Sequence, residues 1–322
     1  MISAKVICDS ISPSGVRLTT MELNYHRFIH AEAKTHRILS LDDEEYEIVL
    51  KQDVDLMDDP MLSRNASSSR AIPVEKMLQQ VKDNPAIPTH WGKNQSGMQA
   101  RDECNKLVTM DWDYYNDCEC TGTREGAWKE AAENARSKAR AFGVAGYHKQ
   151  IVNRLTEPFQ WIKVIVTATE WDNFFKLRLH KDAQPEMMVL AEHMEKAMDE
   201  SIPVELHPGE WHLPYVDLAD FDDSGYPITE AIKCSVARCA RVSYLNHDNS
   251  TPNVEKDIAL ADMLLEAGHM SPFEHQGTPM DFAKDTFELA WENGITHKDR
   301  DNNFWSGNFR SWIQHRQLLS AV

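Results

Sequence analysis

Residues 162–169, Ile-Lys-Val-Ile-Val-Thr-Ala-Thr, restrict the fold more than any other segment. The run is rich in β-branched side chains and alternates as a central strand of a sheet does. Residues 5–8 and 16–25 predict two more strands, because they alternate in the same way on either side of the turn sequence Ser12-Pro13-Ser14-Gly15. Together with the helical patterns elsewhere, these strands predict an α+β fold.

Helical periodicity covers much of the remaining sequence. The segments expected to be helical are 28–39, 74–82, 125–155, 172–178, a segment after 186 that ends near 199, 228–244, 254–267 and 281–292. Pro73 marks a start, Gly268 marks a stop, and Gly143 and Gly146 are expected to interrupt the longest segment. Two long stretches show neither period. We expect 86–124 to be irregular and 203–226 to be a surface loop.

Bulk composition excludes several classes of protein. The chain has 322 residues and a net charge of -17, which argues against general binding to nucleic acid or to a membrane surface. We expect one domain spanning residues 1–322. Six cysteines without zinc-ligand spacing indicate free thiols and no metal site. The sequence contains neither an apolar run of membrane-spanning length nor a cationic leader, so we expect a cytoplasmic protein.

A loop dense in Arg and Ser is divided in two by an acidic segment. Its halves are residues 35–40, Thr-His-Arg-Ile-Leu-Ser, and residues 63–70, Ser-Arg-Asn-Ala-Ser-Ser-Ser-Arg. Guanidinium groups, short hydroxyl donors and backbone amides are suited to phosphate, and three arginines form a local positive site in an acidic chain. The loop therefore predicts a site for a small anion. A solvated polar turn after a helix is the alternative.

The intervening segment, residues 41–63, carries nine acidic side chains and a single basic one, Lys51. One interpretation is a tolerated surface excursion, because the entropy of closing a loop grows slowly with its length. The other is that acids beside an anion site weaken or gate phosphate binding. The sequence leaves both interpretations open.

Joined across this insertion, the two halves resemble the signature R-H-R-x-x-S-x-N-E-x-S-x-R of the flavin-dependent thymidylate synthases, the ThyX-type enzymes. The matching residues are His36, Arg37, Ser40 (or Ser63), Asn65, Ser68 and Arg70. Thr35 replaces the first Arg of the signature, and Ala66 replaces its Glu.

A second set of motifs strengthens the resemblance. The segment Ala-Arg-Cys-Ala-Arg-Val-Ser at 237–243 and the segment Gly-His-Met-Ser-Pro-Phe-Glu-His at 268–275 resemble the A-R-V-S and H-x-[ST]-P-F-E-H elements of that family. In the usual family order both elements precede the R-H-R signature, whereas here both follow it. The chain therefore resembles a circularly permuted branch of the family. The resemblance implies a ThyX-like α+β fold, an antiparallel-rich sheet with packed helices. Joining termini that lie close together makes such a permutation physically reasonable.

The resemblance implies an activity, a set of ligands and an assembly. Deoxyuridylate is methylated to deoxythymidylate, with 5,10-methylenetetrahydrofolate as the carbon donor and NADPH-reduced FAD as the hydride source. None of the six cysteines lies in a Pro-Cys-His setting, as the nucleophile of a classical thymidylate synthase does. Family members are homotetramers whose sites form at subunit interfaces, so a homotetramer is expected.

The residues that the resemblance assigns to chemistry fall into three sets. The expected catalytic residues are Ser68, Arg70 and Arg178. The expected nucleotide-binding residues are Glu32, Ser68, Ser69, Arg70, Arg154 and Arg178. The expected FAD-binding residues are His36, Arg37, Ile38, Asn173, Ser243, Ser271 and Glu274. No metal ligand is implied.

Several of these positions have other interpretations. Arg154 is equally well explained as a solvated residue that balances a helix dipole. Glu32 stands where the family commonly has a nucleotide-contacting Gln, and Asp182 stands where a flavin-contacting His is often found. In the tail, Gln314-His315-Arg316 repeats part of the R-H-R element and is either structural or at the flavin edge. A pyrimidine nucleotide hydroxymethylase and a catalytically impaired flavin or nucleotide binder therefore remain alternatives.

Overall fold

The computed structural model describes residues 1–31, 63–66, 72–96, 100–113, 118–217, 221, 226–242, 253–281 and 291–319, with the backbone alone at 63–66 and 110–120. Across these ranges the chain is a mixed α+β fold, as the sequence predicts. The expected helix at 281–292 and most of the one at 28–39 lie outside the described residues.

The largest sheet has five strands in the order β3-β6-β2-β1-β7. Its strands are β1 (Ser3–Ile11), β2 (Arg17–His26), β3 (Ser63–Ala66), β6 (Trp161–Ala168) and β7 (Val204–Glu205). All neighbours are antiparallel except β1 and β7, which are parallel. The predicted hairpin is confirmed: β1 and β2 are joined by a turn in which Gly15 has φ +79°, a conformation that glycine adopts without steric cost. The predicted strand at 162–169 is confirmed as β6, an interior strand between β3 and β2.

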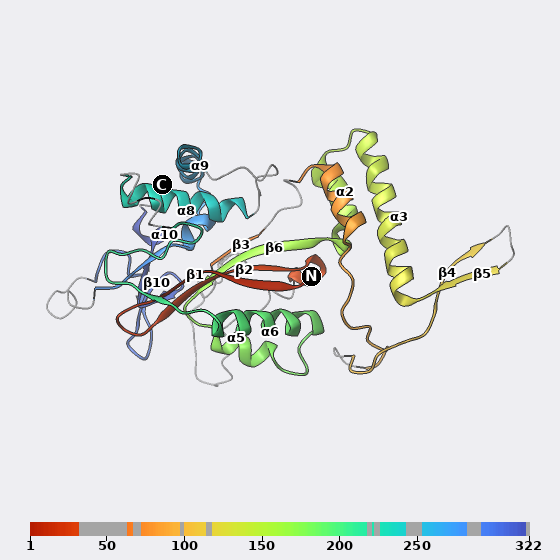
Figure 1. The fold of residues 1–322 in the computed structure, drawn as a ribbon, viewed down its shortest axis with the longest axis horizontal. Helices are drawn as coiled ribbons and strands as arrows, with labels where there is room; N and C mark the ends of the chain where they lie inside the picture. Colours follow the sequence, from red (N-terminus) through yellow and green to blue (C-terminus); the bar gives the residue numbers. More distant parts are fainter. Residues whose placement is uncertain are drawn as a thin grey trace.

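One face of this sheet is covered by α5 (Asp172–Arg178) and α6 (Pro185–Asp199), both close to their predicted bounds (Figure 1). Pro185 occupies the first turn of α6, where its missing amide hydrogen costs nothing. The contact between sheet and helices is an apolar cluster. Its buried members include Met21, Leu23, Tyr25, Ile162, Val164, Val166, Met187, Leu190 and Met194.

The opposite face is covered by α8 (Ile228–Arg241), with α9 (Val254–Glu266) lying over α8. Asn253 caps α9 by accepting a hydrogen bond from the amide of Lys256 at 2.8 Å. Gly268 follows α9 with φ +70° and provides the predicted stop. A 3-10 turn, η3 (Ser271–Glu274), then leads into the short strand β8 (Gly277–Pro279).

A third group of helices packs at the start of β6. It consists of η1 (Arg27–Ile29), α2 (Val74–Asp83), α3 (Arg124–Val144), α4 (Lys149–Val152) and η2 (Asn153–Phe159). The predicted interruption of the long helix is confirmed, since α3 ends at Val144 and Gly146 has φ +87°. The expectation that 86–124 is irregular is wrong in part, because β4 (Val108–Asp113) and β5 (Cys118–Gly122) form a hairpin that projects from the end of α3 (Figure 1).

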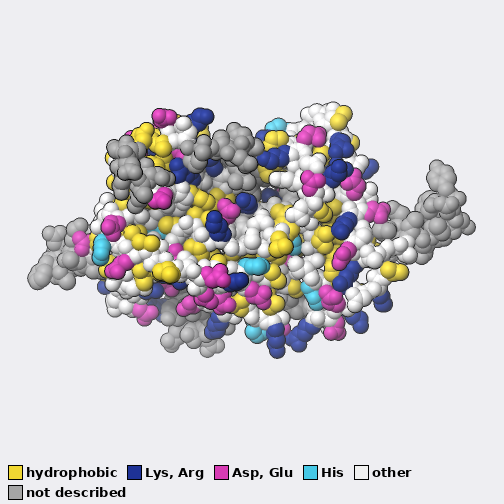
Figure 2. Space-filling view, viewed as in Figure 1, with side chains coloured by type: hydrophobic (Ala, Val, Ile, Leu, Met, Phe, Trp, Pro, Cys, Tyr) yellow, Lys and Arg dark blue, Asp and Glu magenta, His cyan; other side chains and the backbone are white. Residues whose placement is uncertain are grey.

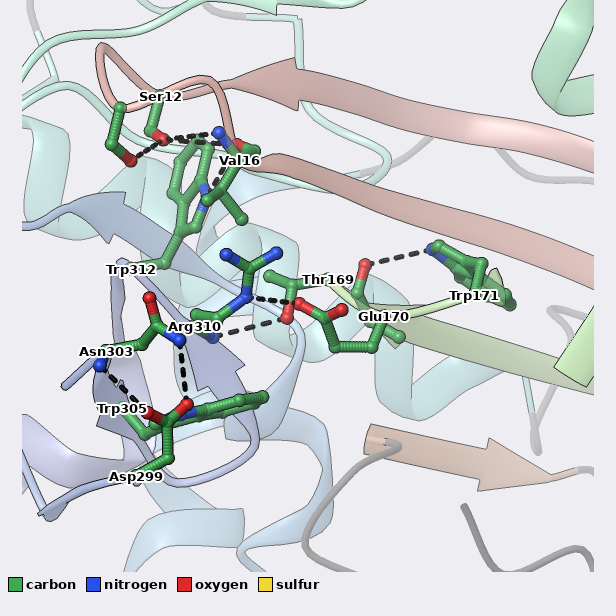
Figure 3. Close-up of polar contacts among 12 residues, drawn as sticks. Ser12, Val16, Thr169, Glu170, Trp171, Asp299, Asn303, Trp305, Arg310 and Trp312 are labelled. Atoms are coloured by element: carbon green, nitrogen blue, oxygen red, sulfur yellow. Dashed lines mark hydrogen bonds and ion pairs between the residues drawn. The ribbon is translucent and has the colours of Figure 1, made fainter. Parts of the chain in front are cut away.

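The C-terminal part forms two small sheets beside the β1–β2 turn. One sheet consists of β9 (His297–Lys298), β10 (Phe304–Ser306) and β11 (Phe309–Arg310). In the other, β12 (Trp312–Gln314) pairs with β8, and α10 (His315–Leu318) follows. Trp312 is fully buried and donates its indole N–H to the carbonyl oxygen of Val16 at 3.1 Å. Figure 3 shows how Arg310 joins this part to the end of β6, since its amide donates to Thr169 and its guanidinium to Glu170.

The expectation that 203–226 is a surface loop is wrong for its central part. His212 is completely buried, and Leu213 and Phe221 belong to an apolar cluster with α8. Its Trp and Pro content reflects packing between elements. The loop places His212 against the polar face of the main sheet.

Candidate functional site

The structure brings together segments from motifs that lie about 200 residues apart in the chain. Strand β3, the first part of the 63–70 half of the Arg-rich and Ser-rich loop, pairs with β6 and contacts η3 of the 268–275 motif. In this pairing Ser63 lies opposite Thr167 and Ala66 lies opposite Val164. Strand β6 therefore pairs with one half of the loop and leads directly into α5, which carries Asn173 and Arg178.

Arg178 lies in the last turn of α5 and is half-buried. Its Nε atom is buried without a hydrogen-bond partner, and burial lowers the pKa of the guanidinium. Within the part of the chain that the structure describes, no carboxylate forms an ion pair with it. A partly desolvated cation without a counter-ion favours an anionic or strongly polarised ligand.

Arg154 lies in an open groove of about 520 Å³ at the other end of β6. The groove is lined by Arg27, Phe28, His30, Ala31, Arg154, Glu157 and Pro158. Arg27 is paired with Glu157 at 3.7 Å, whereas Arg154 is exposed. The groove therefore holds two arginines against one glutamate. It borders the helix that begins at His30, the segment expected to carry Glu32 and His36.

Asn173 lies in the first turn of α5, is partly exposed and interacts with at least one other group of the protein. Asp182, in the loop after α5, forms an exposed ion pair with Arg101 at 2.9 Å. Glu186 is buried and accepts a hydrogen bond from the amide of Thr89 at 2.8 Å and one from Gln184 at 2.6 Å. Gln184 and Glu186 thus hold the loop between α2 and the β4–β5 hairpin against α6.

The η3 turn carries both expected flavin contacts of its motif, Ser271 and Glu274, each partly exposed. Glu274 is bonded to Arg316 of the tail. His315 packs against Phe273, with ring centroids 5.8 Å apart. The partial repeat of the R-H-R element in the tail therefore braces η3. This gives it a structural role in the described part of the chain.

Two arginines of the 237–243 motif converge on one buried carboxylate. Arg238 bonds Asp257 of α9 at 3.0 Å and also donates to the carbonyl oxygen of Tyr215, and Arg241 bonds the other carboxylate oxygen of Asp257. Asp257 is fully buried. The pairing fixes the end of α8 immediately before the position of Ser243, and Asp257 itself carried no sequence signal beyond its place on an amphipathic helix.

A buried polar layer beside η3 was also missed. His212 and His275 are completely buried and are linked through Thr20 and Thr167. Burial lowers the pKa of both imidazoles to about 3, so both rings are neutral. His275 ends a recognised motif, but nothing in the sequence pointed to Thr20, Thr167 or His212 as its partners.

The remaining expected site residues lie outside the described residues. They are Glu32, His36, Arg37, Ile38, Ser68, Ser69, Arg70 and Ser243. The acidic insertion at 41–63 is also outside them, except for the backbone of Ser63. The described site thus consists of Arg154, Asn173, Arg178, Ser271 and Glu274.

The described surface is of mixed charge. Figure 2 shows Lys and Arg side chains interspersed with Asp and Glu over the face in view. In the described ranges, no group of three or more His, Cys, Asp or Glu side chains gathers as a metal site does. Nor does any helix there combine the length and apolar character needed to cross a membrane. No protein-family model matches the chain, and no curated protein is significantly similar to it.

Proposed function

We propose that the chain is a flavin-dependent thymidylate synthase of circularly permuted motif order, with a ThyX-like fold. It methylates deoxyuridylate to deoxythymidylate, with 5,10-methylenetetrahydrofolate as the carbon donor and NADPH as the reductant. One observation carries the proposal: β3, from one half of the Arg-rich and Ser-rich loop, lies against both β6 and η3. Two motifs that resemble one family's site in sequence therefore also meet in space.

The described residues fit an anionic nucleotide and a flavin. Arg178 has a buried, unpartnered Nε atom, and Arg154 lies exposed in the groove with excess positive charge. We assign Arg154 to the nucleotide phosphate and Arg178 to the pyrimidine ring, where a fixed cation stabilises negative charge that develops as the ring becomes nucleophilic. When bound, the reduced flavin supplies the hydride. Asn173, Ser271 and Glu274 would hold it.

A shared site between subunits is part of the proposal. Arg154 precedes β6 and Arg178 follows it, and a strand of this length spans about 25 Å. A single nucleotide is bound by both arginines more readily when two copies of the chain contribute them. The family that the chain resembles forms homotetramers with sites at subunit interfaces, so we propose a homotetramer, which light scattering on the purified protein measures directly.

The test is made on the purified full-length chain. FAD content, NADPH oxidation and deoxythymidylate formation are measured with deoxyuridylate and methylenetetrahydrofolate, and the product is identified by mass. We expect bound FAD and turnover, with Arg178→Ala reducing kcat about 100-fold or more. Arg101→Ala, which removes an exposed arginine paired with Asp182, is the matched control and retains activity.

Each contrary result leads to a different conclusion. A product heavier by one oxygen atom identifies the hydroxymethylase. Bound FAD without turnover identifies the impaired homologue. A wild-type chain that binds neither FAD nor deoxyuridylate refutes the proposal. Deleting 41–63 and repeating the assay shows whether the insertion inhibits turnover.

A further inference from the structure

Five buried side chains form one continuous hydrogen-bonded chain through the sheet. Ser10 bonds His212 Nδ1 at 2.9 Å, and His212 Nε2 bonds Thr20 at 2.8 Å. Thr20 bonds Thr167 at 2.8 Å, and Thr167 bonds His275 Nδ1 at 2.8 Å. No member is more than 2% exposed. This hydrogen-bonded chain of side chains crosses β1, β2 and β6 and ends on His275, the residue that follows η3.

The chemistry of the chain links the protonation of its two ends. A hydroxyl group donates one hydrogen bond and accepts others, and a neutral imidazole donates from one nitrogen and accepts at the other. If His212 donates from Nε2 to Thr20, then Thr20 donates to Thr167, and Thr167 donates to His275 Nδ1. In the reverse direction His275 donates from Nδ1 and His212 accepts at Nε2. Both imidazoles therefore hold the same tautomer.

Thr167 connects two segments that carry parts of the candidate site. It lies opposite Ser63 in the β3–β6 pairing, and β6 leads directly into α5, which carries Asn173 and Arg178. Its hydroxyl holds His275, the residue next to Glu274. This bond is a buried side-chain link between β6 and the η3 segment. The η3 segment carries two expected flavin contacts, Ser271 and Glu274, and α5, which follows β6, carries a third, Asn173.

We propose that Thr167 and His275 are positioning residues of the candidate site. Their hydrogen bond fixes Ser271 and Glu274 relative to Asn173 and Arg178, whereas Thr20 and His212 continue the hydrogen-bonded chain away from the site. His275 Nε2 is buried without a hydrogen-bond partner, which lowers the stability of the fold. Packing alone therefore does not explain why an imidazole occupies this position. The inference rests on the proposed function, because it concerns how that site binds flavin.

The test compares substitutions that keep or remove the bond. Thr167→Val preserves shape and removes the hydroxyl, Thr167→Ser restores the hydroxyl, and His275→Leu removes the imidazole. We expect Thr167→Val and His275→Leu each to raise the FAD dissociation constant about 10-fold and to shift the visible flavin spectrum. Thr167→Ser should restore both. The double variant should be no weaker than either single one, because both remove the same interaction.

Thr20→Val is the matched control. It removes a hydroxyl from the same chain but leaves the bond between Thr167 and His275 in place. We expect it to destabilise the fold to a similar degree without altering flavin affinity or the flavin spectrum. Equal flavin affinity in Thr20→Val and Thr167→Val would overturn the positioning role while leaving the proposed function intact. A wild-type chain without flavin overturns both.

A second measurement does not depend on flavin. Nitrogen-15 NMR of histidine-labelled protein reports which ring nitrogen carries the proton. Identical tautomers at His212 and His275 support the chain, and opposite tautomers refute it. In Thr20→Val the link is cut, so the two tautomers are no longer tied to each other.

Discussion

The two faces of the main sheet are built on different principles. On one face, strands β2 and β6 meet α5 and α6 through an apolar cluster that includes Met21, Val164 and Leu190. On the other, under α8, the sheet presents Thr20 and Thr167 to the buried imidazoles of His212 and His275. Helix α8 is itself fixed to α9 through the buried carboxylate of Asp257.

This difference separates the face that contributes most to stability from the face that fixes the relative positions of polar groups. Burying aliphatic and thioether side chains stabilises the first face by about 1.5–3 kcal/mol for each side chain, with little dependence on direction. Hydrogen bonds on the second face contribute less net free energy but fix donors and acceptors at set distances. The motif segments η3 and 237–243 both adjoin the polar face. The more directional face therefore carries the part of the candidate site that these two motifs form, whereas Asn173 and Arg178 lie on α5, on the apolar side of the sheet.

The largest effect is expected at the α8–α9 contact. Asp257→Asn keeps the size of the side chain but leaves Arg238 and Arg241 without their buried counter-charge, so it should lower the free energy of unfolding by about 3–5 kcal/mol. Urea denaturation measures the change. Asp262→Asn on the same helix is the control, since its pair with Lys233 is exposed and should contribute no more than about 1 kcal/mol. Equal costs for both variants would show that charge does not hold α9.

On the apolar face, Leu190→Ala removes a side chain that is 1% exposed and leaves a cavity against β2 and β6. It should lower the free energy of unfolding by about 3 kcal/mol, as seen in urea denaturation. Flavin affinity of the folded protein should not change. Glu192→Ala, on the exposed side of α6, should change stability by no more than about 0.5 kcal/mol. Loss of flavin with stability retained would contradict the division between the faces.

The smallest expected effect, counted per pH unit, is a loss of stability at acidic pH that the two buried histidines of the polar face cause. His212 and His275 have pKa values of about 3 when folded, against about 6.5 when unfolded, so below pH 6.5 the unfolded chain binds more protons. Stability should fall as pH drops from about 6.5 toward 3, by up to about 1.4 kcal/mol per pH unit for each imidazole. Denaturation series at pH 7, 6 and 5 measure the slope. His212→Asn removes one titrating imidazole, so it should lower the slope by the contribution of one proton. An unchanged slope would contradict the burial of a neutral imidazole.

How far the sequence predicts the structure differs between segments. Helices α6 and α9 follow from periodicity and punctuation, with Pro185 at the start of α6 and with Asn253 and Gly268 on either side of α9. Strand β6 follows from its run of β-branched residues. The β4–β5 hairpin was missed although residues 108–113, Val-Thr-Met-Asp-Trp-Asp, alternate apolar and polar side chains, because the stretch around them is polar and irregular in pattern. His212 was missed because a loop rich in Trp, Pro and Asp was expected at the surface.

The candidate site shows the same limit. Arg154, Arg178, Ser271 and Glu274 were predicted through motif resemblance, whereas Asp257 and Thr167 were not. These two act through partners 16 and 108 residues away, in the pairs Arg241–Asp257 and Thr167–His275. A motif records which residue types a site uses. It does not record which other segment holds them in place.

The sequence by itself determined the class of fold, most of the elements and the two motifs, because periodicity and turn chemistry act over a few neighbouring residues. Only the tertiary structure decided that β3 and η3 meet beside β6, and that Ser10 is bonded to His212, 202 residues away. Such pairings are selected because a buried donor or acceptor without a partner costs free energy, so most of them are paired. That requirement is satisfied by the whole fold at once, and no local pattern encodes it.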